Sequence, residues 1–238
     1  MSRSIVRMPD HRRLAAAMSG GCFALAALSA QAAELSASGA LTNDYVFRGI
    51  SQTQGDPAAQ FGTRAVASDG LYGQVWGSTV EFAGDTGASS EVDYVVGWAG
   101  DIADHWAADV NLTYFDYPSA RVELAYAELI GTLTWKRDYW LMVGYSPDVF
   151  ATGEAGIYTA LGARFPVNDA LRLEAVVGHY ALDDAYDASY SHASLGGAWA
   201  FRAPFELRVT AHRTDADGEH LFPGAAGSRV EATLQATF

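Results

Sequence analysis

Apolar and polar residues alternate without a break along the last eleven residues of the chain, 228–238. The apolar positions are Val230, Ala232, Leu234, Ala236 and Phe238, and the polar positions between them are Arg229, Glu231, Thr233, Gln235 and Thr237. Because successive side chains on a strand point to opposite faces, this pattern predicts a strand with one apolar and one polar face. A strand between lipid and an aqueous lumen has this character.

Similar alternation recurs about every ~17 residues, which predicts an all-β chain. The segments are 35–48, 59–68, 71–82, 90–99, 105–116, 122–135, 138–146, 155–165, 170–181, 190–201, 205–214 and 228–238. Most are close to the ~9–11 residues that a tilted strand needs to cross a bilayer. No comparable helical periodicity occurs, so we expect a closed antiparallel transmembrane β-barrel of twelve strands.

The connections between these segments alternate in length. The even-numbered connections are short: 69–70, 100–104, 136–137, 166–169 and 202–204. Most odd-numbered ones are longer: 49–58, 83–89, 146–154, 182–189 and 215–227, with 117–121 as a compact exception. Short turns on one side and longer loops on the other are typical of outer-membrane barrels, whereas a soluble sandwich has no reason to sort its loops.

Five of the six tryptophans lie beside the short turns, and Trp76 is the exception. The five are Trp98, Trp106, Trp135, Trp140 and Trp199, and Phe238 lies at the same level. Tyrosine and phenylalanine dominate the opposite strand ends. Two aromatic girdles at the membrane interfaces would produce this sorting. The alternative is that aromatic residues simply favour strands, but this predicts no sorting of tryptophan to one end.

Residues 1–32 have the features of a cleaved secretory signal peptide, with four early arginines, an apolar run and a small-x-small site at Ala30-Gln31-Ala32. We therefore expect a mature domain over 33–238. The lone cysteine, Cys22, lies within the signal, and a lipoprotein reading of that cysteine is a weaker alternative. The whole chain has 15 basic and 28 acidic residues; removing 4 and 1 with the signal leaves a net charge of −16. This charge argues against nucleic acid as a partner.

Several segments carry a family resemblance. The stretch 41–54 reads LTNDYVFRGISQTQ and is followed by Leu71–Val80 (LYGQVWGSTV), Glu91–Tyr94 (EVDY) and Tyr114–Pro118 (YFDYP). These motifs resemble the TorF-type porins, also called the Gcw_chp family, over the first half of the mature chain. The resemblance implies a bacterial outer-membrane barrel acting as a channel, without catalytic residues or cofactors. The expected partners are the lipid bilayer and lipopolysaccharide, small polar solutes, and the barrel-assembly machinery through the C-terminal strand.

Strand parity predicts which charged residues line the lumen. They are Asp44, Arg48, Arg64, Glu91, Asp93, Asp109, Glu128, Arg164, Arg172, Glu174, Glu206, Arg208, Arg229 and Glu231. Acids on the fourth to sixth strands would face bases on the eighth, ninth, eleventh and twelfth, which would create a transverse field across a constriction. The alternative is a self-neutralising network. It would pair Arg172 with Glu174 or Glu206, Arg208 with Glu231, and Asp44 with Arg48. Arg48 could instead guard the mouth.

Two other functions remain open at this stage. A closed binding or structural barrel would have the same strands and fully paired lumen charges. A rim hydrolase would need a serine, a histidine and an acid to converge among His179, Ser191, His192, Ser194 and the nearby aspartates. The acidic runs at 183–187 and 215–220 could hold calcium, but neither has the spacing of a twelve-residue calcium loop. We expect a non-enzymatic channel without a metal or cofactor.

Overall fold

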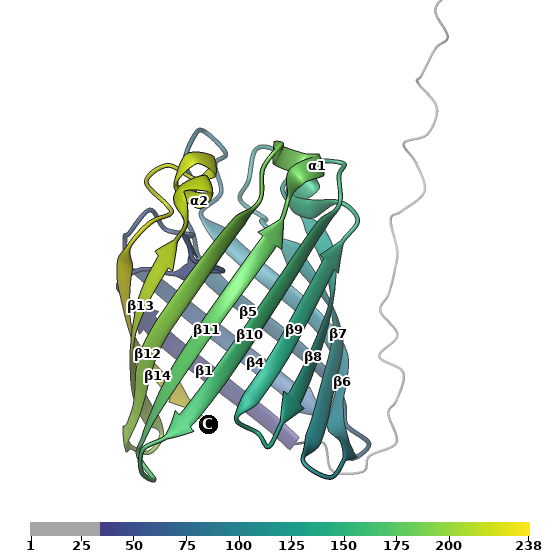
Figure 1. The fold of residues 1–238 in the computed structure, drawn as a ribbon, viewed down its shortest axis with the longest axis vertical. Helices are drawn as coiled ribbons and strands as arrows, with labels where there is room; N and C mark the ends of the chain where they lie inside the picture. Colours follow the sequence, from purple (N-terminus) through teal and green to yellow (C-terminus); the bar gives the residue numbers. More distant parts are fainter. Residues whose placement is uncertain (1–33) are drawn as a thin grey trace, which may run out of the picture. The chain divides into compact units, whose positions relative to one another are not determined.

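The computed structural model describes residues 34–238, and the signal peptide expected over 1–32 lies outside the described residues. Twelve antiparallel strands form one closed barrel (Figure 1). They are β1 (Glu34–Thr42), β4 (Ala58–Val66), β5 (Leu71–Thr79), β6 (Ser90–Ala103), β7 (Trp106–Asp116), β8 (Tyr126–Trp135), β9 (Tyr139–Ser146), β10 (Gly156–Pro166), β11 (Leu171–Ala181), β12 (Tyr190–Arg202), β13 (Phe205–Thr214) and β14 (Arg229–Thr237). The predicted twelve-stranded barrel is confirmed.

The barrel closes where β1 pairs with β14, placing Leu41 opposite Leu234. The first strand was predicted to run to residue 48, but it ends at Thr42. The Asn43 side chain explains this end: Nδ2 donates to the Val230 carbonyl at 3.1 Å, and Oδ1 accepts from the Ala232 amide at 2.5 Å. The side chain thus occupies the next backbone pairing position on β14, and the main chain turns away from the sheet.

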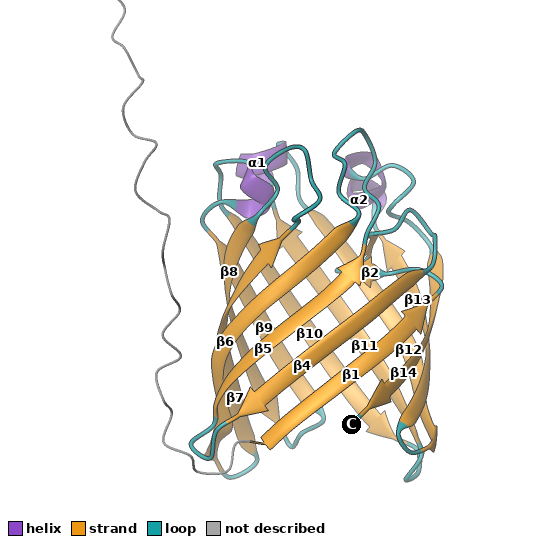
Figure 2. Ribbon diagram, turned by 180° about the vertical axis from the view of Figure 1, so that it is seen from behind, coloured by secondary structure: helices purple, strands orange, loops and turns teal. Residues whose placement is uncertain are grey.

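All the longer connections lie at one end of the barrel, here called the loop end (Figures 1 and 2). They carry the small hairpin of β2 (Val46–Phe47) and β3 (Ile50–Ser51), the 3₁₀ turn η1 (Val149–Ala151), and the helices α1 (Asp183–Tyr186) and α2 (Ala216–Leu221). The short turns lie at the opposite end, here called the turn end. The predicted alternation of turns and loops is therefore confirmed. Within residues 34–238, no helix is long and apolar enough to cross a membrane.

An apolar surface surrounds the outside of the barrel. Its exposed residues include Leu35, Leu41, Phe61, Val75, Val96, Val110, Leu129, Leu141, Leu161, Val177, Leu195, Val209, Val230 and Leu234, which come from every strand of the barrel. Water would penalise so much exposed apolar area, whereas lipid favours it. A closed barrel with an apolar outer face satisfies all its strand hydrogen bonds internally, as a bilayer requires.

Four of the five tryptophans expected at the turn end face outward, namely Trp98, Trp106, Trp135 and Trp199. Trp140 differs, because it alternates with the exposed Tyr139 and Leu141 and therefore lies on the inner face of β9. Its ring lies where a Cβ on the facing Gly162 would be, so that glycine makes room for it. Phe238 follows β14 and is 75% exposed.

Candidate functional site

The charged side chains expected in the lumen form two groups at different levels of the barrel. Near the turn end lie Arg64, Asp109, Arg164, Arg172, Glu174, Glu206 and Arg208. Near the loop end lie Asp44, Arg48, Glu91, Asp93, Glu128, Arg229 and Glu231. Asp44 and Arg48 come from the first loop, which folds inward, rather than from a strand. The two groups differ in how they are paired and how far they are buried.

At the turn end, three arginines share two glutamates. Arg172 contacts Glu206 at 2.5 Å and Glu174 at 2.9 Å. Arg208 lies 2.8 Å from Glu206 and 3.6 Å from Glu174. Arg164 lies 3.1 Å from Glu174. These side chains are 20–44% exposed, so water reaches this network and the attraction between its charges is screened.

The opposite wall of the turn end carries a looser pair. Arg64 and Asp109 are 4.0 Å apart. The Tyr72 hydroxyl donates to Asp109 at 2.8 Å, and the Arg64 guanidinium lies 3.6 Å from the centre of the Tyr72 ring. A cation–π contact therefore holds Arg64 against the wall.

The Arg48 side chain lies buried at the loop end, between Glu128 and aromatic rings. Its two terminal nitrogens donate to the two carboxylate oxygens of Glu128 at 2.9 and 2.7 Å. Its guanidinium also lies 4.0 Å from the Tyr158 ring centre and 4.8 Å from the Tyr180 ring centre. The side chains of Arg48 and Glu128 are 5% and 0% exposed. A bidentate pair held between rings is rigid, and this is the most deeply buried ion pair among the described residues.

The electrostatics of Arg48 follow from this geometry. Burial alone would lower the pKa of the guanidinium, because water no longer stabilises its charge. The adjacent Glu128 carboxylate, helped by Tyr180 and Tyr126, outweighs burial, and together they raise the pKa of Arg48 above its usual range. Arg48 is thus charged at every physiological pH.

Asp44 pairs with Arg229 at 2.7 Å and not with Arg48, so the expected Asp44–Arg48 pair is wrong. Asp44 stays beside β14, whereas the chain turns back at Arg48 (φ 50°) and Gly49 (φ 83°) and sends the Arg48 side chain across the lumen to β8. A side chain at Gly49 would be strained by this positive φ, and its Cβ would lie 2.7 Å from the Cβ of His192.

Among the other predicted pairs, Arg172 does contact both Glu174 and Glu206. The predicted Arg208–Glu231 pair is absent from the described residues. Arg208 remains with the turn-end glutamates, and Glu231 accepts from His212 at 3.1 Å. Arg208 and Glu231 do not pair because they lie at different levels of the barrel: Glu231 is close to the loop end of β14, and Arg208 is close to the turn end of β13.

Glu91 and Asp93 are the exception to this pairing. Glu91 is 3% exposed and accepts one hydrogen bond, from the Tyr117 hydroxyl at 3.2 Å. Its second oxygen, Oε2, and the buried Oδ1 of Asp93 have no hydrogen-bond partner in the described part of the chain. Both side chains lie on the inner face of β6, two residues apart. A buried carboxylate without a partner is costly, which distinguishes this pair from every other acid at the loop end.

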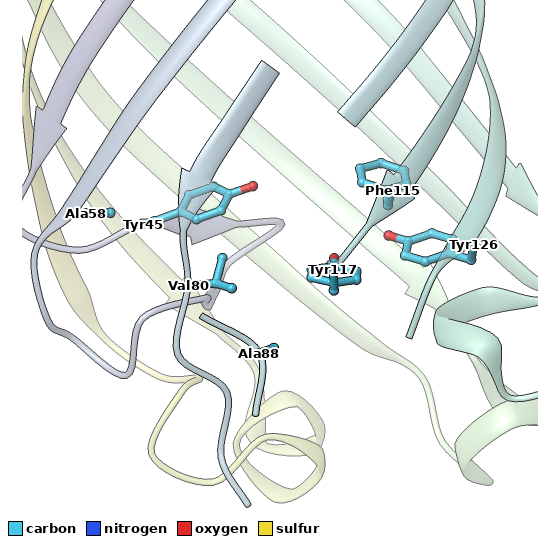
Figure 3. Packing of buried hydrophobic residues seen from close by; sticks show 7 residues of the cluster. All are labelled: Tyr45, Ala58, Val80, Ala88, Phe115, Tyr117 and Tyr126. Carbon is cyan, nitrogen blue, oxygen red and sulfur yellow. The ribbon is translucent and has the colours of Figure 1, made fainter. Parts of the chain in front are cut away.

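A cavity of about 330 Å³ opens at the loop end, and we call it the vestibule. Aromatic rings from all six loop-end connections and from the ends of three strands surround it: Phe47, Phe82, Tyr117, Tyr126, Phe150, Tyr180, Tyr186, Tyr190 and Phe222. Figure 3 shows the part of this aromatic packing formed by Tyr45, Phe115, Tyr117 and Tyr126. Tyr117 lines the vestibule and donates to Glu91, so Glu91 lies directly behind this ring, with Asp93 two residues further along β6.

The aromatic girdle expected beside the longer loops included Tyr158 and Tyr180, but both rings are buried and contact Arg48 instead. The sequence did not single out Phe150, whose ring centre lies 5.2 Å from that of Tyr126. Tyrosine at a strand end is common, and only closure of the barrel brings these rings to the first loop. The inward parity of Tyr158 and Tyr180 was the one signal available.

The groups of a rim hydrolase do not converge. His179 and Ser191 form a cross-strand pair on the outer face, with Nδ1 and Oγ 3.0 Å apart. His192 points into the lumen and contacts the Tyr158 hydroxyl at 2.9 Å. No carboxylate in residues 34–238 hydrogen-bonds His179, so the third group of a triad is missing there. The same residues contain no group of three potential metal ligands.

Comparison with known proteins supports the fold. The KdgM porin, solved in complex with disordered oligogalacturonate, has a TM-score of 0.54 at 6% identity, covering 86% of this chain and 98% of its own. The NanC porin has a TM-score of 0.54 at 10% identity, covering 86% and 99%. No curated protein matches the sequence. At these identities, the similarity establishes the barrel fold alone.

The family model described as "Bacterial protein of unknown function (Gcw_chp)" matches residues 26–238. In bacteria, closed barrels with an apolar outer face and alternating turns and loops are proteins of the outer membrane. The chain is therefore a bacterial outer-membrane β-barrel, and it belongs to the Gcw_chp family.

Proposed function

We propose that this barrel is a TorF-type porin, a channel for passive diffusion of small polar solutes, with its narrowest part at the Arg48–Glu128 pair. The observation that carries the proposal is the lumen itself. Charged side chains line it at both ends, those at the turn end are hydrated, and those at the loop end are packed around Arg48. By analogy with outer-membrane barrels, the loop end faces the cell exterior and the turn end faces the periplasm.

The lumen charges support local neutralisation more than a simple transverse field. Arginine and glutamate alternate within the turn-end network, and Arg48 neutralises Glu128, the acidic residue of β8. The residual field comes from the unpaired Glu91 and Asp93, which oppose a turn-end network with one arginine in excess. Solutes would therefore pass from an acidic outer mouth to a mildly basic inner one.

Contacts with lipid and with the barrel-assembly machinery would insert the barrel into the outer membrane. The outer face offers lipid a continuous apolar surface, and the acidic loops can bind lipopolysaccharide through bridging divalent ions. We place recognition by the barrel-assembly machinery at β14, whose alternation ends with the exposed Phe238.

The close packing of Arg48 and Glu128 also favours a second candidate, a closed barrel that binds a ligand without conducting. Liposome swelling separates the two. Proteoliposomes in isotonic glycine, arabinose or sucrose should swell in that order of rate if the lumen is open. The double variant Arg48→Ala/Glu128→Ala removes both charges together and should admit larger solutes.

The matched control is Arg164→Ala, which removes a half-exposed arginine at the turn end and should leave the size limit unchanged. Swelling in glycine by the native barrel would support the channel. If the native protein and the double variant both fail to swell liposomes while remaining folded, the closed barrel is the correct description.

A further inference from the structure

The vestibule and the acidic pair together form a site with a distinct chemistry. The vestibule walls are mostly rings, and its volume of about 330 Å³ suits a small molecule. Ring faces carry negative partial charge and attract organic cations as well as apolar bodies. No arginine or lysine lines this cavity within the described part of the chain, so anions would find little to bind there.

Glu91 and Asp93 lack a basic partner. Each of the other three acidic side chains in the loop-end group has one: Glu128 has Arg48, Asp44 has Arg229, and Glu231 has His212. Glu91 and Asp93 each have a buried oxygen with no partner in residues 34–238. Figure 3 shows the Tyr45 and Tyr126 hydroxyls directed into the same ring cluster, beside Tyr117. A ligand with a positive hydrogen-bond donor would satisfy these oxygens.

The acidic residues of the loop-end connections would concentrate cations at the loop-end opening of the lumen. The six loop-end connections, residues 43–57, 80–89, 117–125, 147–155, 182–189 and 215–228, contain thirteen aspartates and glutamates against two arginines. One of these arginines, Arg48, is already neutralised by Glu128. A mouth lined by one sign of charge raises the local concentration of the opposite ion.

We propose that the vestibule selects small organic cations, molecules with an ammonium group on an apolar or aromatic body, with the body among the rings and the ammonium on Glu91 and Asp93. This inference names the solute class of the proposed channel and rests on that function for its role. The binding itself does not depend on conduction. Cation–π attraction and two charge-assisted hydrogen bonds act on the same ligand.

Titration calorimetry of the refolded barrel in detergent tests the proposal with three matched probes: phenethylammonium, 2-phenylethanol and phenylacetate. They share one ring and differ in charge. Phenethylammonium should bind tightest and phenylacetate weakest. Glu91→Gln/Asp93→Asn should weaken phenethylammonium binding by about tenfold or more, to the level of the alcohol, because the charge-assisted bonds are lost. The single variants should lie between.

The control is Asp101→Asn/Asp104→Asn, which removes the same two charges at the turn end of β6, where both residues are exposed. It should leave phenethylammonium binding unchanged. Equal affinity for all three probes, or equal loss in both double variants, would overturn the proposal. Conduction without ammonium binding would sink this inference alone, whereas ammonium binding by a folded barrel that never conducts would sink only the channel.

Discussion

Arg48 is the residue on which the proposed narrow part of the lumen depends. Its backbone is left-handed, its side chain is buried, and its charge is matched by one carboxylate on a strand 80 positions away in sequence. The adjacent Gly49 lets the loop approach His192 closely enough for the guanidinium to reach Glu128. One residue thus ties the first loop to the opposite wall.

Breaking this pair on one side should be costly. We expect Arg48→Met to lower the free energy of unfolding by about 3–5 kcal/mol, because Glu128 remains charged and fully buried without a partner. Arg48→Met/Glu128→Gln should regain most of that loss. Unfolding by guanidinium chloride in lipid vesicles measures the free energy of unfolding of the single and the double variant. Equal destabilisation by the single and double variants would show that the loop packing, rather than the ion pair, holds the mouth.

At the scale of strands, side-chain parity decides which residues meet lipid. Leu195 lies near the middle of β12 and is 62% exposed, whereas the neighbouring Ser194 faces the lumen. Replacing an apolar lipid-facing residue with arginine places a charge in hydrocarbon, whereas the lumen offers water.

Leu195→Arg should therefore lower the free energy of unfolding by about 2–4 kcal/mol, as expected for a charge near the bilayer midplane. Ser194→Arg, one position away, should cost much less. Chemical unfolding of both variants in the same vesicles gives the comparison. Similar losses would mean that the assignment of the two faces of β12 is wrong.

The strands could be read from sequence because alternation is local, and the structure follows nearly all of the predicted segments. The end of β1 could not be read, because it depends on a hydrogen bond from Asn43 to β14, the last strand. Trp140 likewise faces inward because Gly162 on the next strand leaves space for its ring. Strand parity gives only an expectation for the lumen positions, and the partners of Asp44 and Arg48 depend on how the first loop folds, which no local pattern records.

For the whole molecule, charge is distributed unevenly between the two ends. The loop end is strongly acidic, with Glu91 and Asp93 uncompensated, and the turn end has one more arginine than glutamate in its main network. Ions entering from the loop side meet the acidic mouth first. The barrel should consequently favour cations over anions, most clearly at low salt, where exposed charges are least screened.

Single-channel recording of the refolded protein in a planar bilayer, with reversal potentials measured in a salt gradient, tests the central claim most directly. The account predicts discrete conductance steps and a preference for potassium over chloride. This preference should decline from 0.1 M to 1 M salt, because the Debye length falls from about 10 to about 3 Å and the lumen charges are screened. Heat-modifiable gel mobility confirms that the inserted protein is folded. A folded barrel that gives no steps, or one that prefers chloride, would contradict the account.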